Sequence, residues 1–306
     1  MRSLSDEKLK IIAAECGIFL AITLGILKAI TAFYTGSLSI LSSMIDSLSD
    51  AFSSLISLIA VRFSALPLDN KHRYGYGKAE ALSAFLQAAF IVGSGIFVLY
   101  DGTRRFIKPE IVKETTIGLT VMIFSIIATF AVIIFQKYVA RKTKSLALEA
   151  ESQHYVVDLL TNSAIIFSLL FLKYFDWQWI DIATAFAISI YLIWNAVILA
   201  LKALDDITDC EADDKTKEII KQIILETNNV LGYHDLRSRV SGMRTFVELH
   251  LELDGNSSLF ETHKISDEVE RKIVEKLPQV QVIIHQDPHG LKENRLDDEL
   301  KGKCDL

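Results

Sequence analysis

Two stretches of the chain carry ionisable residues inside otherwise apolar sequence: LSSMIDSLSD at residues 41–50, followed by AFSSLISLIAV, and ESQHYVVDLLTN at residues 151–162, followed by SAIIFSLLFL. Each stretch holds a pair of such residues four positions apart, namely Asp46 with Asp50 and His154 with Asp158. Residues at i and i+4 lie on one face of a helix, so each pair directs two side chains toward one point. Because a charged residue at the centre of a membrane costs about 2.5–3.5 kcal/mol on insertion scales, the pairs indicate buried or cavity-lining positions with a function.

Each pair also has an interpretation that involves no ligand. Asp46 and Asp50 lie in a serine-rich stretch, and a polar helix face that lines a bundle would look the same. His154 would lie in water if its span began later in the chain. Both pairs have the same spacing, and they lie in the only predicted spans with acids at depth, so a shared set of ligands is favoured. Three carboxylates and one imidazole supply the four ligands that a zinc-like divalent ion accepts.

The composition is typical of a membrane protein with an attached soluble region. Of the 306 residues, 51% are hydrophobic, and the mean hydropathy is +0.32. Apolar segments fill the first two thirds, whereas the chain from about residue 205 onward is strongly charged, which places a domain boundary there. The net charge of −6 gives no support for nucleic-acid binding. The three scattered cysteines include no CxxC pair, so they indicate neither a disulfide framework nor a thiolate zinc site.

Several segments are long and apolar enough to cross a bilayer as helices, because about 20 residues span its hydrocarbon core. We predict six such spans, near residues 11–33, 39–63, 80–101, 116–137, 153–174 and 179–203. The connections on the side of the N-terminus carry eleven lysines and arginines, and those on the other side carry five. The positive-inside rule therefore predicts that both termini lie in the cytoplasm. The first span has acids as well as bases before it and no clear cleavage site, so it is predicted to be retained.

The region after the spans changes its periodicity. Apolar residues recur at helical spacing over 213–227 and 260–277. Between and after these helices, residues 234–242, 244–254 and 279–287 read as strands, the first two joined by a turn at Ser241-Gly242. The order helix, strand, strand, helix, strand predicts a small α+β sheet with helices on one face. From Pro288 onward the chain is predicted to be charged and flexible.

Histidines are concentrated in this soluble region. Five of the seven lie there: His234, His250, His263, His285 and His289. His250 alternates out of phase with the apolar residues of its strand, which places it on the polar face, and His285 shares a strand face with Asp287. Single surface histidines usually have no special role. Several on adjacent strands beside a carboxylate make a metal site an equal alternative.

The chain resembles the cation diffusion facilitators, in particular their bacterial zinc and ferrous-iron efflux branch. The resemblance covers nearly the whole length and is carried by five motifs: YTGSLSILSSMIDSLSD (34–50), PLDNKHRYGYGKAEAL (67–82), SQHYVVDLLTN (152–162), GYHDLRSR (232–239) and VIIHQDP (282–288). It implies an α-helical membrane protein with six transmembrane helices, a C-terminal α+β ferredoxin-like cytoplasmic domain, and a homodimer. The expected division is a transmembrane domain at 1–206, a cytoplasmic metal-binding and dimerisation domain at 207–290, and a charged flexible tail at 291–306.

The resemblance also implies roles for particular residues. The implied transport site is Asp46, Asp50, His154 and Asp158. Asp69 and His72 match two ligands of a site in the loop after the second span, where Tyr76 replaces the third ligand, a histidine. Because a phenol titrates near pH 10, tyrosine is a poor zinc ligand, and we expect weak binding there. The implied binuclear cytoplasmic site is His234, His250, His263, His285 and Asp287, with His263 reaching to the partner protomer. Lys78 matches a charge interlock, with Asp209 as its expected partner and Asp206 as the second choice.

The function implied is a proton-coupled antiporter that exports Zn²⁺ from the cytoplasm across the inner membrane, with Cd²⁺ and Fe²⁺ as further candidate substrates. Zinc is also expected as a structural and regulatory ion in the cytoplasmic domain. Expected partners are a second copy of the chain, membrane lipid, metal ions and protons, but no nucleic acid. An intramembrane zinc hydrolase is a weaker alternative, because the sequence has no HExxH and no glutamate neighbours the pair as a general base. A membrane-anchored metal sensor is the other, and we do not expect an enzyme.

Overall fold

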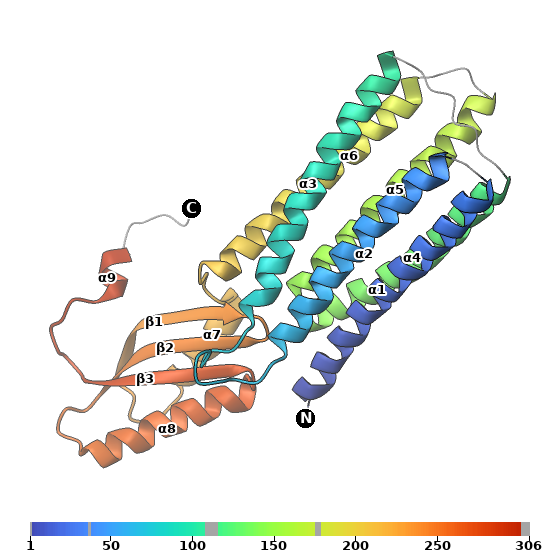
Figure 1. The fold of residues 1–306 in the computed structure, drawn as a ribbon. Helices are drawn as coiled ribbons and strands as arrows, with labels where there is room; N and C mark the ends of the chain where they lie inside the picture. The colour runs from blue at the N-terminus through green and yellow to red at the C-terminus, as the bar shows by residue number, and fades with distance from the viewer. Residues whose placement is uncertain (1, 36–37, 108–115, 175–178, 301–306) are drawn as a thin grey trace. The chain divides into compact units, whose positions relative to one another are not determined.

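The fold was derived from a computed structural model of the chain (Figure 1). It describes four stretches of the chain: 2–35, 38–107, 116–174 and 179–300. The side chains of some further residues within helices, Asp46 among them, lie outside the described part. The chain forms two compact units, Met1–Ile207 and Thr208–Leu306, and each is described by itself.

The first unit is built from long helices. They are α1 (Arg2–Thr35), α2 (Leu38–Ser64), α3 (Lys78–Ile107), α4 (Thr116–Thr143), α5 (Leu146–Tyr174) and α6 (Trp179–Ile207). Every predicted span falls inside one of these helices. α1, α3, α4, α5 and α6 run several residues past the predicted bounds, because hydropathy detects only apolar sequence, whereas good helix formers continue the helix into polar sequence. The prediction of a helical membrane unit is confirmed.

Helix packing in this unit depends on small residues and on polar contacts. α3 packs along α6, and α1 packs along both α2 and α4 (Figure 1). Alanines fill the buried contacts of α1, α2, α4 and α5, which allows the close approach that membrane helices need. Among the described residues, four helices are long and apolar enough to cross a membrane by length and composition; they are α1, α3, α4 and α6. In the part of the chain that the structure describes, α2 and α5, which carry the predicted ligands, are not in this set.

A buried ion pair joins α1 to α3 near the N-terminus of the chain. Lys10 Nζ lies 2.5 Å from Glu80 Oε1, and both side chains are 3% exposed. The hydroxyl of Ser64 donates to the same Glu80 oxygen at 2.6 Å, and that of Ser145 donates to its other oxygen. One carboxylate therefore joins α1, the end of α2, α3 and the turn before α5, and its charge is fully paired.

The second unit follows the predicted order of elements. It contains α7 (Asp214–Leu225), β1 (Gly232–Ser241), β2 (Arg244–Leu253), α8 (Leu259–Lys276), β3 (Val280–Pro288) and the short α9 (Leu296–Leu300). β1 pairs antiparallel with β2, and β2 pairs parallel with β3, in the sheet order β1-β2-β3. Ser258 and Glu261 form a capping box that fixes the start of α8. The predicted α+β fold is confirmed, and α9 is an element that the sequence pattern did not predict.

The sheet has one apolar face and one polar face. Val247, Leu249, Leu251 and Leu253, which alternate along β2, are buried in a core with the isoleucines of α7 and with Val269 and Ile273 of α8. The intervening residues of β2, which include His250 and Glu252, lie on the opposite face because side chains alternate along a strand. Both long helices of this unit, α7 and α8, therefore cover the apolar face of the sheet, and neither covers the polar face.

Candidate metal centres

α2 and α5 bring three of the four predicted transport ligands together. Ligand atoms of Asp50, His154 and Asp158 all lie within 4.8 Å of one another. His154 Nε2 is 3.1 Å from Asp50 Oδ1, and these two side chains are only 13% and 15% exposed. The fourth predicted ligand, Asp46, belongs to α2, but its side chain lies outside the described residues. The described trio offers two carboxylates and one imidazole to a single point.

Tyr155 holds this cluster against the neighbouring helices. Its hydroxyl donates to the carbonyl of Gly17 at 2.8 Å and lies 2.8 Å from the hydroxyl of Ser54. Because the phenol proton is committed to Gly17, the Ser54 hydroxyl is the donor in the second contact. These bonds link α5 to α1 and α2 at the residue after His154, so they fix the rotation of α5 that presents the ligands.

Glu151 is a buried acid that the sequence reasoning missed. It is completely buried three residues before His154, and the expectation that no glutamate lies near the pair was wrong. Ser54, Ser57 and Gln136 surround its carboxylate. A Cβ at Gly17 would come within 2.1 Å of Glu151 Oε1, so any larger residue there would force this buried carboxylate to move. The helical spacing of Glu151, His154 and Asp158 was the signal that could have identified it.

The loop between α2 and α3 brings Asp69, His72 and Tyr76 together on the surface. Tyr76 donates its phenol proton to Asp69 Oδ2 at 2.5 Å, and His72 Nδ1 lies 3.2 Å from Asp69 Oδ1. The hydrogen bond from Tyr76, followed by that from the backbone N–H of His72, lowers the pKa of Asp69 to about 2. The same bond raises the pKa of Tyr76, because the phenol proton is held by a carboxylate. Tyr76 thus acts as a donor to a predicted ligand, where a histidine could have served as a ligand itself.

The two members of the predicted charge interlock lie in different units. Lys78 Nζ donates to the carbonyl of Ile207 at 3.1 Å, which ties the start of α3 to the end of α6. Asp209 Oδ2 is 3.8 Å from Arg239 Nη1 within the second unit. Asp206, the second choice, belongs to α6. The pairing of Lys78 with Asp209 stays a prediction.

Strand register builds the cytoplasmic cluster on the polar face of the sheet. His234 of β1 lies opposite His250 of β2, and His250 lies beside His285 of β3. The three imidazoles therefore form a row across the sheet, with ring centroids 4.8 Å and 4.7 Å apart. Two residues further along on the same face, Glu252 lies beside Asp287. A row of imidazoles next to a row of carboxylates follows from these two registers.

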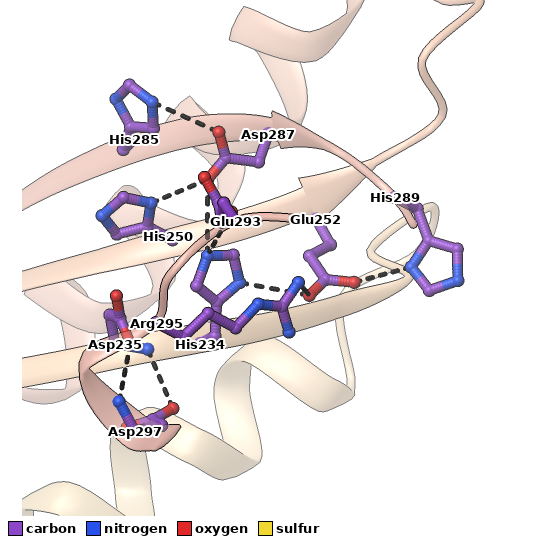
Figure 2. Close-up of polar contacts among 10 residues, drawn as sticks. All are labelled: His234, Asp235, His250, Glu252, His285, Asp287, His289, Glu293, Arg295 and Asp297. Carbon is purple, nitrogen blue, oxygen red and sulfur yellow. Dashed lines mark hydrogen bonds and ion pairs between the residues drawn. The ribbon is translucent and has the colours of Figure 1, made fainter. Parts of the chain in front are cut away.

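Asp287 connects the histidines (Figure 2). Its Oδ2 is 2.7 Å from His250 Nδ1 and 3.6 Å from His234 Nε2, and its Oδ1 is 3.2 Å from His285 Nε2. One carboxylate thus presents different oxygens to different imidazoles, which is the arrangement of a bridge between two ion positions. His263 does not join this cluster within the described residues; it lies on α8, 62% exposed, with its Nε2 3.4 Å from Asp267. That it serves a partner protomer stays a prediction.

Glu252 orients His234 and was not predicted. His234 Nδ1 lies 3.1 Å from Glu252 Oε1, while His289 Nδ1 and Arg295 approach the same carboxylate at 2.6 Å and 2.8 Å. Partial burial works against ionisation, but the hydrogen bond from His289 and the charge of Arg295 lower the pKa of Glu252 overall. An ionised carboxylate only accepts, so Nδ1 of His234 carries a proton, and in the neutral imidazole Nε2 keeps its lone pair. This carboxylate–histidine arrangement is typical of metal-binding histidines.

The residues around Nε2 of His234 fit a divalent ion. Ligand atoms of His234, His250, Asp287 and Glu293 lie within 4.8 Å of one another. Nε2 of His234 is buried and makes no hydrogen bond within the described residues. Two imidazoles and two carboxylates form a four-ligand nitrogen and oxygen set of the kind that zinc accepts, and their charges balance a divalent cation. Sequence reasoning missed Glu293, since nothing in its local pattern points to the sheet.

Comparisons with known proteins give a family match for each of the two units. The transmembrane domain of cation efflux proteins matches residues 16–208, and the cytoplasmic domain of the same proteins matches residues 212–289. The cation-efflux pump FieF of Shewanella oneidensis is 39% identical over 277 residues, which cover 90% of this chain and 93% of that protein. FieF of Klebsiella pneumoniae is 37% identical over 279 residues, covering 91% and 93%. The metal-bound C-terminal domain of the CzcD transporter from Thermotoga maritima is 25% identical, with a TM-score of 0.25, and covers 26% of this chain and 93% of that one.

Proposed function

Because the chain belongs to the cation efflux family, the cation diffusion facilitators, we propose that it exports Zn²⁺ from the cytoplasm in exchange for protons. Cd²⁺ and Fe²⁺ are the alternative substrates. The observation that carries this proposal is the convergence of Asp50, His154 and Asp158 within 4.8 Å in the helical unit. Acids and imidazoles are costly inside a membrane, so a cluster of them there is best explained by an ion pathway.

The ligand chemistry supports a borderline divalent ion as the cargo. With Asp46 as the fourth member, the site offers one nitrogen and three oxygen ligands. A mixed shell of this kind disfavours the soft ion Cu⁺, and a four-ligand shell disfavours Mg²⁺, which prefers six oxygens in octahedral geometry. Zn²⁺ accepts the four-ligand arrangement without a geometric penalty.

The same ligands provide a means of proton coupling. Carboxylates must be ionised and histidine neutral to bind a metal ion, so protonation of Asp50, His154 or Asp158 competes with the cation. When this site faces the compartment richer in protons, the ligands take up protons and the metal ion leaves. The proton gradient across the membrane would then drive export.

We further propose that the cytoplasmic unit is a regulatory metal site in a homodimer at the inner membrane. Its imidazole row and bridging carboxylate support two neighbouring ion positions, and His263 of the partner subunit would add a ligand. Metal bound there stabilises whichever transport conformation it binds more tightly. The basic residues of the connections favour cytoplasmic termini, which would place this unit where it senses the metal to be exported.

The decisive experiment measures metal flux driven by a pH gradient in liposomes that contain the purified protein. We expect Asp50→Ala to reduce Zn²⁺ flux to the background of empty liposomes, because it removes a ligand shared by metal and proton. Asp50→Asn should do the same while keeping the shape of the side chain. Asp214→Ala is the matched control, since the Asp214 side chain is 100% exposed at the start of α7, and it should transport normally.

Equal flux in Asp50→Ala and Asp214→Ala would refute the transport site. Flux that does not respond to the pH gradient, yet requires Asp50, would retain the site and refute proton coupling. Repeating the measurement with Cd²⁺, Fe²⁺ and Mn²⁺ ranks the substrates.

A further inference from the structure

The chain after β3 folds back over the polar face of the sheet. We call residues 289–300 the C-terminal strap. At its start, the backbone N–H of His289 donates to the carbonyl of Leu253 at 2.8 Å. Near its end, Asp297 and Asp235 exchange hydrogen bonds, each carboxylate accepting from the other's backbone N–H at 3.0 Å. Two fixed points therefore flank the middle of a segment that the sequence pattern predicted to be flexible.

The attachment between Asp297 and Asp235 lies beside the cluster of candidate metal ligands on the sheet. Asp235 has a φ of 51°, and the register of β1 against β2 shifts directly after His234. This bulge turns the backbone N–H of Asp235 out of the ladder, where Asp297 accepts from it. Partial burial opposes ionisation of Asp235, but the hydrogen bond from the Asp297 N–H lowers its pKa overall. The strap is thus attached at the residue next to His234.

Between the anchors, the strap places a carboxylate over the cluster. Glu293 Oε1 is 3.0 Å from His234 Nε2, and Figure 2 shows the carboxylates of Glu293 and Asp287 both facing that nitrogen. His234 Nδ1 is engaged by Glu252, so in the neutral imidazole Nε2 has no proton to offer either carboxylate. The 3.0 Å separation does not have the geometry of a hydrogen bond, and Nε2 of His234 makes none within the described residues.

Three acceptor atoms that face one another repel unless a cation lies between them. A buried lone pair and two carboxylates in a partly desolvated place are costly if they are left unpaired. Protonation of His234 on both nitrogens would satisfy one contact, but a divalent cation satisfies His234, Asp287 and Glu293 together. Without Glu293, one carboxylate and two imidazoles would leave a divalent ion with a net positive charge and three ligands.

We propose that Glu293 is a fourth ligand of a divalent cation held by His234, His250 and Asp287, and that this ion fastens the C-terminal strap to the sheet. The role of Glu293 rests on the cytoplasmic metal site proposed above. Binding and closure of the strap are reciprocal: an ion that binds better with the strap closed must favour closure to the same extent. The strap then reports metal occupancy as a change in its own order.

Hydrogen–deuterium exchange of the full-length protein in detergent tests this proposal. Backbone exchange within residues 289–300 is followed during a Zn²⁺ titration that starts from chelator-treated protein. We expect Zn²⁺ to slow exchange in the strap. Glu293→Gln should raise the Zn²⁺ concentration for half-maximal protection at least about 10-fold, since even an indirect partner of a metal ligand is worth about 10–100-fold in affinity.

Two further variants make the outcomes distinct. Glu299→Gln makes the same chemical change at an exposed position of the strap and should leave the titration unchanged. His234→Ala should remove the Zn²⁺ response of the strap altogether. If Glu293→Gln behaves like Glu299→Gln while His234→Ala loses the response, the cytoplasmic site stands and the role of Glu293 is refuted. If His234→Ala also keeps the response, the proposed site itself is wrong. If the strap of the native chain is equally protected in chelator, an ion does not fasten it.

Discussion

The membrane cluster and the cytoplasmic cluster use the same side chains but are built in opposite ways. Asp50, His154 and Asp158 come from two helices, and His154 and Asp158 are four residues apart on one of them. His234, His250, Asp287 and Glu293 come from three strands and the C-terminal strap, across about sixty residues of sequence. The first arrangement follows from helical periodicity, which is local. The second depends on strand register and on a chain segment that returns, which are not local.

This difference has a functional side. A site whose ligands come from packed helices needs no further segment to complete it, which would suit the transported ion proposed above. A site closed by a strap gains a ligand when the strap is fastened, which suits an ion that stays bound and reports its concentration. The two clusters should therefore be separable by mutation.

The largest expected effect comes from removing one ligand at each cluster in turn. Asp158→Asn should reduce Zn²⁺ flux in liposomes to background and leave the Zn²⁺-dependent protection of the strap unchanged. His234→Ala should abolish the Zn²⁺-dependent protection of the strap, because loss of a ligand costs more than loss of an indirect partner. Its flux should persist at saturating Zn²⁺. Flux and exchange measured on the same preparations test this. Loss of both properties in either variant would mean that the clusters form one obligatory unit.

An intermediate effect is expected from glycines that face the two clusters. At Gly17 a Cβ would lie 2.1 Å from Glu151 Oε1, whereas at Gly93 a Cβ would meet nothing within 4 Å. Gly17→Ala should destabilise the helical unit by about 1–3 kcal/mol, the usual cost of overpacking. Gly93→Ala is the matched control on a helix and should not destabilise it. Thermal unfolding in detergent compares the two.

At the cytoplasmic cluster, Gly232→Ala should be milder than Gly17→Ala. Its Cβ would lie 3.1 Å from Glu252 Oε2, which the carboxylate can relieve by a small shift. Equal destabilisation by Gly17→Ala and Gly93→Ala would show that Glu151 does not pack against α1 as described, and would weaken the contrast between a rigid and an adjustable cluster.

The smallest effect is expected in the loop between α2 and α3, where Asp69 and His72 are two candidate ligands without a third. Tyr76→Phe removes the main hydrogen bond that stabilises ionised Asp69. The pKa of Asp69 should therefore rise from about 2 toward its ordinary value of 3.8, so the carboxylate takes up its proton at higher pH. Carboxyl chemical shifts followed by NMR during an acid titration would measure this.

Tyr76→His offers the matching gain of function, since an imidazole in place of the phenol gives the loop two histidines and a carboxylate. It should strengthen Zn²⁺ binding by the loop. An unchanged pKa of Asp69 in Tyr76→Phe would show that the phenol is not its partner in solution.

Much of the fold was predictable because each element carries a local pattern. Apolar segments of membrane length predicted the helices, and the alternation of residues 244–254 predicted β2 and placed His250 on the polar face. The short α9 was missed, since five residues carry too little periodicity to register. The strap was expected to be flexible because its charges suggest exposure to water, yet Arg295 and Asp297 find their partners on strands far away in sequence.

The sequence alone identifies the candidate metal ligands of the membrane helices, because a charge there is costly and helical spacing is regular. It also determined the fold class and, through its motifs, the family. Three features required the folded structure: Glu151 is buried near His154, Tyr76 donates to the carboxylate of Asp69, and Glu252 and Glu293 flank His234. Each of these depends on which segments meet in space, and that is set by the packing of whole elements and not by the residues next to them in the chain.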